Sequence, residues 1–206
     1  MKPFFLLLLV FCLIQCKEET SVNSVIAEKD NIAMAHPQVI DSLVVLKEVL
    51  QLNQLKGIWY YNKKPFNGYA VTYYSNGIME EKLGFFNGKR EGVAQRWSEN
   101  KVLRVVSNYN QNKLVGSYKT WWENGELAEE SNYANGVVQG IQKQWYTNGQ
   151  LAKMRNLDKG REDGMQQAWL KNGTCYVNYE AKNGRVFGLM RSNLCYQLED
   201  EVVTRK

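Results

Sequence analysis

Glycine recurs in this chain with a period of 24 residues, and this period constrains the fold more than any other feature. Of the 16 glycines, 14 occupy three phases of the period, without an insertion or deletion between them. When the first phase is numbered position zero, the other two fall at positions nine and twenty. The first phase comprises Gly68, Gly92, Gly116, Gly140, Gly164 and Gly188. The chain is therefore predicted to fold as an array of structural repeats.

Aromatic and turn-forming residues follow the same period. Position five holds Tyr73, Trp97, Trp121, Trp145 and Trp169. Asparagine fills position eight before the position-nine glycine, and such pairs favour tight turns because Asn tolerates a left-handed backbone and Gly adopts positive φ. A second turn signal precedes position twenty, and the enrichment in Trp, Tyr and Val favours strands. The predicted fold class is all-β, an elongated single antiparallel sheet of consecutive 24-residue hairpins.

The parity of the repeat positions predicts which side chains share a face of this sheet. Positions five, eleven and seventeen are odd, so turns that preserve parity would place their Trp, Leu and Tyr side chains on one apolar face. Positions two, four and twelve, for instance Gln142, Gln144 and Ala152, would then lie on the other, mostly solvated face. We interpret the position-five ladder as packing, and an exposed strip that stacks a glycan or peptide is the alternative.

Two of the four cysteines, Cys175 and Cys195, lie on either side of the last predicted hairpin turn. If the final hairpin turns about Gly184 and Arg185, the numbers of facing residues sum to 370, and Cys175 then faces Cys195. A disulfide between these two residues is predicted as a cap on the C-terminal end of the array. Two unpaired thiols are the alternative.

The N-terminus has the pattern of an export signal. Phe4–Ile14 is an uncharged apolar run of 11 residues, whereas a membrane-spanning helix needs about 20. Residues 1–15 are therefore predicted to be a signal peptide. The Leu-Ile-Gln-Cys sequence that ends at Cys16 resembles a bacterial lipobox, although Gln15 stands where a small residue is usual. We predict lipidation of Cys16 and attachment to the bacterial outer membrane, and cleavage by an ordinary signal peptidase is the alternative.

The segment between this signal and the repeats has two parts. Residues 16–37 read as a tether, and its Lys17–Glu19 start is similar to a signal that exposes some outer-membrane lipoproteins at the cell surface. A merely polar start of the mature chain is the alternative. Residues 38–54 are apolar enough for a short amphipathic helix, which would cap the N-terminal edge of the sheet, or for a degenerate first repeat.

Composition argues against several classes of function. His36 is the only histidine and lies in the tether, so no metal site, cofactor or catalytic triad is predicted. Without Lys2 the chain has 25 basic and 21 acidic residues, and the resulting formal charge of +4 is scattered, which does not indicate nucleic-acid binding. The carboxylates considered as an acid and base pair are spread along strands and turns: Glu80, Glu81, Glu123, Glu126, Glu129 and Glu130.

The recurring pattern G-x-x-x-x-W-[YW]-x-N-G-x-L followed by Y-x-N-G, as written from Gly116 to Gly136, resembles the MORN-repeat variant proteins. The resemblance covers residues 55–198 and includes a half-repeat at Gly57–Gly68. Residues 199–206 are predicted to be a C-terminal tail. Proteins of this family are similar to a group often labelled toxin–antitoxin system antitoxins, and that label implies a partner-binding role.

The function predicted from these features is that of a non-enzymatic, membrane-anchored repeat protein. Its lipid would hold it to the membrane, and its extended β surface would bind a protein or a glycan. An antitoxin or immunity-like protein that neutralises one cognate effector is the first alternative. A carbohydrate-active enzyme that uses the aromatic strip is the second.

Overall fold

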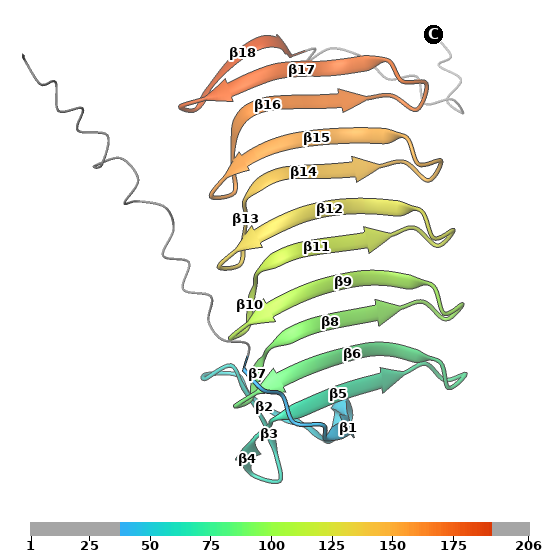
Figure 1. Cartoon of the computed structure of the whole chain (residues 1–206), viewed down its shortest axis with the longest axis vertical. Coiled ribbons are helices and arrows are strands. Elements are labelled where there is room, and N and C mark those ends of the chain that lie inside the picture. The colour runs from blue at the N-terminus through green and yellow to red at the C-terminus, as the bar shows by residue number, and fades with distance from the viewer. Residues whose placement is uncertain (1–37, 191–206) are drawn as a thin grey trace, which may run out of the picture. The chain divides into compact units, whose positions relative to one another are not determined.

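A computed structural model of the chain describes residues 38–190 (Figure 1). Consecutive strands lie side by side in a 15-stranded sheet, which is antiparallel except at its first pair, and a second sheet has three strands. The predicted all-β fold of successive hairpins is confirmed. The predicted signal peptide, Cys16, the tether with His36, Cys195 and the tail lie outside the described residues.

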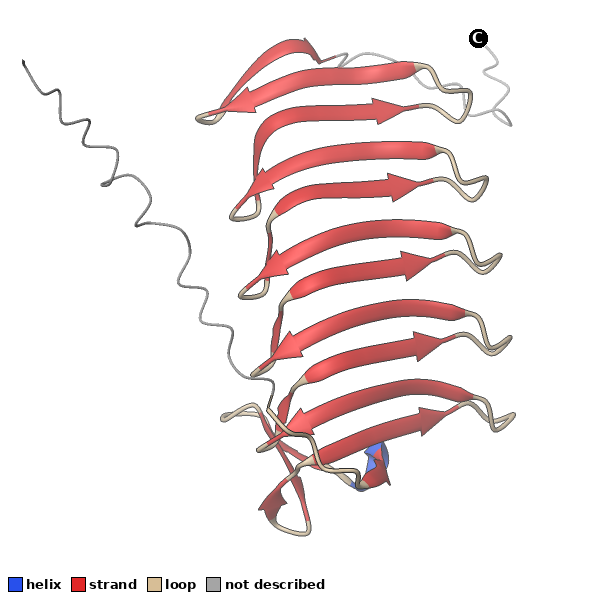
Figure 2. Ribbon diagram, viewed as in Figure 1, coloured by secondary structure: helices blue, strands red, loops and turns tan. Residues whose placement is uncertain are grey.

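Each repeat contributes one pair of long strands, and the loops that join them lie along the two margins of the sheet (Figure 2). The pairs are β5 (Gly68–Tyr73) with β6 (Met79–Phe86), β8 (Gly92–Trp97) with β9 (Leu103–Asn110), β11 (Gly116–Trp121) with β12 (Leu127–Ala134), β14 (Gly140–Trp145) with β15 (Leu151–Asp158), and β16 (Arg161–Trp169) with β17 (Cys175–Lys182). Two-residue strands β7 (Lys89–Arg90), β10 (Lys113–Leu114) and β13 (Val137–Val138) follow three of them, and β18 (Arg185–Met190) pairs with β17.

The loop around positions eight and nine has the same hydrogen bonds in every repeat. In the first repeat Tyr74 N–H donates to Ile78 O at 2.8 Å, and Gly77 N–H donates to Tyr74 O at 2.9 Å. Gly77 has φ +80°, as predicted, and Lys101 takes the same conformation in the second repeat with φ +63°. Asn76 does not adopt a left-handed backbone, which corrects the role expected for it. Its Oδ1 accepts the Ile78 N–H at 3.0 Å and so fixes the loop.

The second predicted turn is a two-residue turn in which both residues have positive φ. Asn87 and Gly88 have φ of +48° and +74°, and the corresponding pairs of the other four repeats adopt the same conformation. This is the geometry of a type I′ turn, whose twist matches that of the flanking strands. The glycine N–H also links repeats, because Gly88 N–H donates to Phe66 O at 2.7 Å.

The predicted sharing of one face by positions five and seventeen is wrong. Gly116 faces Tyr133 and Thr120 faces Glu129, so an even number of residues separates facing positions and parity changes across the hairpin. A β-bulge then brings Trp121 opposite Leu127. We name the two sides by their aromatics. The tyrosine face carries positions two, four, thirteen, fifteen and seventeen, and the tryptophan face carries positions one, three, five, eleven and fourteen.

The tyrosine face is the more buried one, which corrects the expectation that position two is solvated. Gln142 and Gln166 at position two are only 6% and 2% exposed. Position seventeen contributes its Phe, Tyr and Leu side chains to the same face, where Phe85 and Leu157 are 0% and 6% exposed. On the tryptophan face, Val93 and Ile141 at position one are 50% and 51% exposed. The position-five tryptophans share that face and are half-buried, and Tyr73 is exposed.

The main apolar core lies at the N-terminal end of the array. Its buried members are Leu50, Phe66, Ala70, Leu83, Phe85 and Ala94. The segment that covers them comprises β1 (Val44–Leu46), the 3₁₀ turn Lys47–Val49, β2 (Gln51–Asn53), β3 (Ile58–Tyr61) and β4 (Lys64–Pro65). Residues 38–54 thus form neither an α-helix nor a repeat hairpin. The β-branched Val44 and Val45 lie in β1, which pairs with β5 in parallel at the edge of the sheet.

The register assumed for the predicted disulfide is also wrong. The last turn is Asn183-Gly184, and Lys182 faces Arg185, so the numbers of facing residues sum to 367 and not to 370. Cys175 itself faces Trp169 and is exposed, and its Sγ lies 3.2 Å from Val177 O. The turn lies earlier in the chain than predicted, and the register is shifted by three residues. The pairing of Cys175 with Cys195 stays a prediction, since Cys195 lies outside the described residues.

Candidate binding groove

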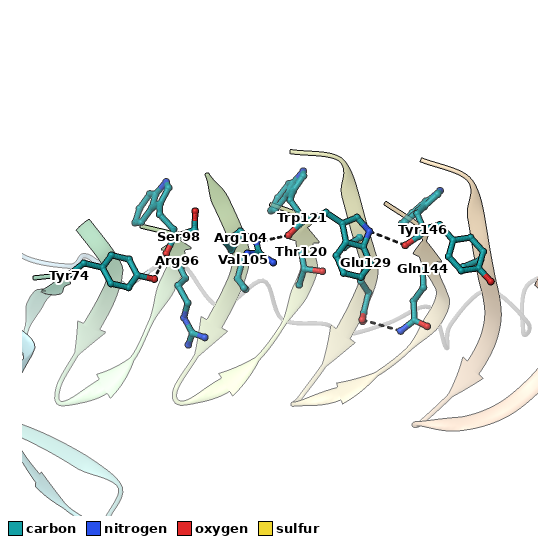
Figure 3. A pocket seen from close by; sticks show the side chains of 15 residues that line it. Tyr74, Arg96, Ser98, Arg104, Val105, Thr120, Trp121, Glu129, Gln144 and Tyr146 are labelled. Atoms are coloured by element: carbon teal, nitrogen blue, oxygen red, sulfur yellow. Dashed lines mark hydrogen bonds between the residues drawn. The ribbon is translucent and has the colours of Figure 1, made fainter. Parts of the chain in front are cut away.

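A groove of about 720 Å³ runs across the tyrosine face near the loops at positions seven to ten (Figure 3). The middle repeats supply most of its lining. Its aromatic walls are Tyr74, Trp122 and Tyr146, its small residues include Ala128 and Ala152, and its polar groups include Arg96, Arg104, Thr120, Glu129 and Gln144. Trp97, Trp121 and Trp145 of the predicted ladder border it as well.

The aromatic side chains at position six connect each repeat to the next. Tyr74 Oη donates to Trp97 O at 2.9 Å, and Trp122 Nε1 donates to Trp145 O at 3.0 Å (Figure 3). Tyr146 Oη likewise donates to Trp169 O at 2.8 Å. A hydrogen bond to the backbone therefore fixes each ring. Because its polar atom is used in this way, the ring presents mainly apolar surface to the groove.

The second repeat achieves the same link by a different pair of residues. Position six is Ser98 there, and position twelve is Arg104 where the next two repeats have alanine. Arg104 Nε donates to Trp121 O at 2.8 Å, so the arginine replaces the missing aromatic donor. Its Nη1 pairs with Glu123 Oε2 at 2.6 Å. Hydrogen bonds from Asn100 and Ser98, and then from Arg104, lower the pKa of Glu123.

Glu129 is the centre of a polar network on the floor of the groove. Its carboxylate accepts hydrogen bonds from Ser131 Oγ at 2.6 Å, Gln142 Nε2 at 2.7 Å and Gln144 Nε2 at 3.2 Å. Arg155 Nε in turn donates to Gln142 Oε1 at 2.9 Å. Neutral donors thus satisfy the hydrogen-bonding capacity of the Glu129 carboxylate. The carboxylate in turn holds the Gln144 amide at the groove.

A smaller pocket of about 230 Å³ adjoins the groove, and Arg96 and Val105 border both. Lys47, Arg90 and Arg96 contribute positive charges to its lining, and Glu81 contributes a negative one. Lys47 Nζ lies 2.6 Å from the Glu81 carboxylate, and an Arg96 nitrogen lies 3.4 Å from it. One carboxylate therefore serves two cations at the junction of the two cavities.

The Glu81 cluster should make stability depend on pH. Burial by itself would raise the pKa of Glu81, but hydrogen bonds and charges from Lys47 and Arg96 outweigh burial and lower it. A carboxyl whose pKa is lower in the folded state stabilises the fold above its unfolded pKa of about 4.3. We expect the free energy of unfolding to decline as the pH falls below that value. Glu81→Gln should remove part of this decline in urea titrations at several pH values, and identical pH profiles would contradict the assignment.

Catalytic groups do not converge in this groove. Glu129 is the only one of the six predicted carboxylates among its lining, whereas Glu130 on the opposite face pairs with Lys119 at 2.9 Å. Residues 38–190 contain no cluster of three or more side chains suited to hold a metal ion. Within the same range, no helix has the length and apolar character needed to cross a membrane.

The family described as MORN repeat variant matches residues 114–135 and 138–158. Residues 114–158 therefore contain two repeats of the MORN repeat variant type. The two matched units cover the third and fourth hairpins and supply Trp122, Glu129, Gln144 and Tyr146 to the groove. A MORN-variant array of β-hairpins is compatible with a non-enzymatic repeat protein. None of the curated proteins matches this chain.

Sequence reasoning missed Arg96, Arg104 and Gln144 as groove residues. The sequence feature that could have identified them is departure from the repeat pattern. Position four changes from Thr to Arg to Thr to Gln to Ala along the array. Position twelve likewise changes from Glu80 and Arg104 to two alanines. Such departures mark places where the repeated backbone carries different side chains, and the groove lies there.

Proposed function

We propose that this protein is a non-enzymatic binding protein whose groove holds an extended protein or glycan ligand. The observation that carries the proposal is that the groove lies where the array departs from its own repeat. Rings fixed at Trp122 and Tyr146 border small residues at Ala128 and Ala152, which leaves an open hollow lined by oriented polar groups. Preorganised polar groups and fixed aromatic rings lower the entropic cost of binding.

The second repeat suggests substitutions that change this hollow, because its residues already occur at the same positions of the repeated backbone. The double variant Trp122→Ser with Ala128→Arg copies the Ser98 and Arg104 pair into the third repeat, so the arginine can donate to Trp145 O as Arg104 does to Trp121 O. Gln144→Thr is a milder change, because Thr120 occupies the same position one repeat earlier. Ile141→Ser is the matched control on the tryptophan face, where Ser117 is the equivalent residue.

Affinity capture from the native envelope, with ligand quantified for each variant, tests the proposal. We expect the double variant to lose most of the captured ligand, Gln144→Thr to retain part of it, and Ile141→Ser to retain it fully. Equal capture by all variants would show that the groove is not the site. Capture of one tight protein effector would instead favour the antitoxin-like alternative.

We also propose that the protein is exported and anchored to the outer membrane through lipid on Cys16. The support is the sequence alone, namely the apolar run of 11 residues and the lipobox-like segment that ends at Cys16. Cys16→Ser should release the protein from the membrane fraction on cell fractionation. Unchanged membrane retention of that variant would contradict the anchor.

A further inference from the structure

We propose that the ligand is an acidic polysaccharide that carries uronate carboxylates, and that Arg96 binds one of these carboxylates at the junction of the two cavities. This inference rests on the proposed function of the groove. Three features of the tyrosine face support it: an excess of positive charge at one end, rings at the spacing of the repeat, and the lack of a free strand edge.

The first feature is the charge around Arg96. Lys47 holds the near oxygen of Glu81 at 2.6 Å, whereas Arg96 makes a longer contact of 3.4 Å with the other oxygen. The Arg96 side chain is 57% exposed, and Arg90 lines the same pocket. Glu81 therefore neutralises one of its two cations, and Arg96 has free donors. A guanidinium binds a carboxylate through two parallel hydrogen bonds, which favours a planar acidic group there.

The second feature is the spacing of the aromatic rings. Trp122 and Tyr146 occupy the same position in adjacent repeats, which are two strands or about 9.6 Å apart. That separation is close to the length of a disaccharide unit in an extended polysaccharide. Both rings are fixed by hydrogen bonds to the next repeat and turn apolar surface to the groove. Each can therefore stack against the apolar side of a sugar ring, while Arg96 and Gln144 extend to one side of the strands (Figure 3).

The third feature disfavours a peptide. An extended peptide gains much of its affinity by adding a strand to an open sheet edge. The strands beneath the groove have no open edge, because β11 pairs with both β9 and β12, and β14 pairs with both β12 and β15. The backbone of these strands is therefore already paired, which leaves their side chains to bind the ligand. The polar ones are guanidinium, amide and hydroxyl groups, which suit the hydroxyl and carboxylate groups of a sugar polymer.

The test measures binding of a polyuronate to the full-length protein by isothermal titration calorimetry. Two further probes are the same polymer after its carboxyl groups are reduced to alcohols, and poly-L-glutamate. Arg96→Thr removes the charge, and Thr72 and Thr120 occupy the same repeat position. Lys143→Gln is the matched control, since it removes one charge from the tryptophan face and Gln95 and Gln167 are its equivalents.

We expect the polyuronate to bind best and Arg96→Thr to weaken it about tenfold or more, with no change for Lys143→Gln. Equal binding of the reduced polymer would overturn the role of the carboxylate. Tighter binding of poly-L-glutamate would overturn the choice of a polysaccharide. If no probe binds while native ligand capture still depends on the groove, this inference fails and the proposed function stands. If capture is independent of the groove, both fail.

Discussion

Gly88→Ala is expected to lower the free energy of unfolding by about 3 kcal/mol. Gly88 is the second residue of the first type I′ turn, with φ +74°, a conformation that costs about 1–2 kcal/mol for a residue with a Cβ atom. The added Cβ would also lie 2.5 Å from Trp59 O and 2.4 Å from the Ile58 side chain. Neither clash is easily relieved, because one partner is backbone and the other is a β-branched residue in a short strand.

The position of this turn makes the clash costly. Gly88 O accepts the Trp59 N–H at 2.8 Å, and Gly88 N–H donates to Phe66 O at 2.7 Å. These two bonds attach the N-terminal segment to the first repeat. A displacement of the turn would therefore weaken both the segment and the core that it covers.

Gly136→Ala is the matched control, since Gly136 occupies the same turn position two repeats later with φ +86°. Only Lys113 Cβ, at 4.0 Å, lies near its added Cβ. The conformational cost alone remains, so we expect a loss of about 1–2 kcal/mol. Urea denaturation of both variants measures the difference. Equal losses would show that the close approach of Ile58 and Trp59 is unimportant for stability.

The sequence was sufficient to predict the repeated hairpins and both turns, because glycine adopts positive φ more readily than other residues and recurs at fixed spacing. It was insufficient to predict the faces. Facing residues depend on the exact number of residues in each loop and on the bulge between Thr120 and Trp121. A shift of one residue moves every side chain to the other face, and this is how position seventeen came to lie apart from the tryptophans.

The groove itself was not predicted from the sequence. Trp97, Trp121 and Trp145 of the position-five ladder border it, although position five belongs to the tryptophan face. The residues that shape it are those that break the repeat, such as Arg96 and Arg104. The charge cluster around Arg96 could not be inferred, because Lys47, which shares the Glu81 carboxylate with Arg96, comes from a segment outside the 24-residue period.

Phe85→Ala is expected to destabilise the N-terminal end of the array by about 4 kcal/mol, since truncation of a buried phenylalanine leaves a cavity. Phe85 is 0% exposed, and its ring centroid lies 5.6 Å from that of Phe66 and 6.0 Å from that of Trp59. Tyr133 occupies the same repeat position but is only half-buried, and its main ring partner is Tyr118 at 5.6 Å. Tyr133→Ala should therefore cost less, about 2 kcal/mol.

These two variants should differ in where along the array stability is lost, and not only in how much is lost. In a repeat array each unit contacts only its neighbours, so stability is a sum of local terms. Native-state hydrogen exchange of Phe85→Ala should show faster exchange in β5 and β6, with the amides of β15 and β17 unchanged. Tyr133→Ala should instead accelerate exchange around β11 and β12. Uniform acceleration along the sheet in both variants would mean that the array unfolds as one cooperative unit, and the groove would then depend on the N-terminal core.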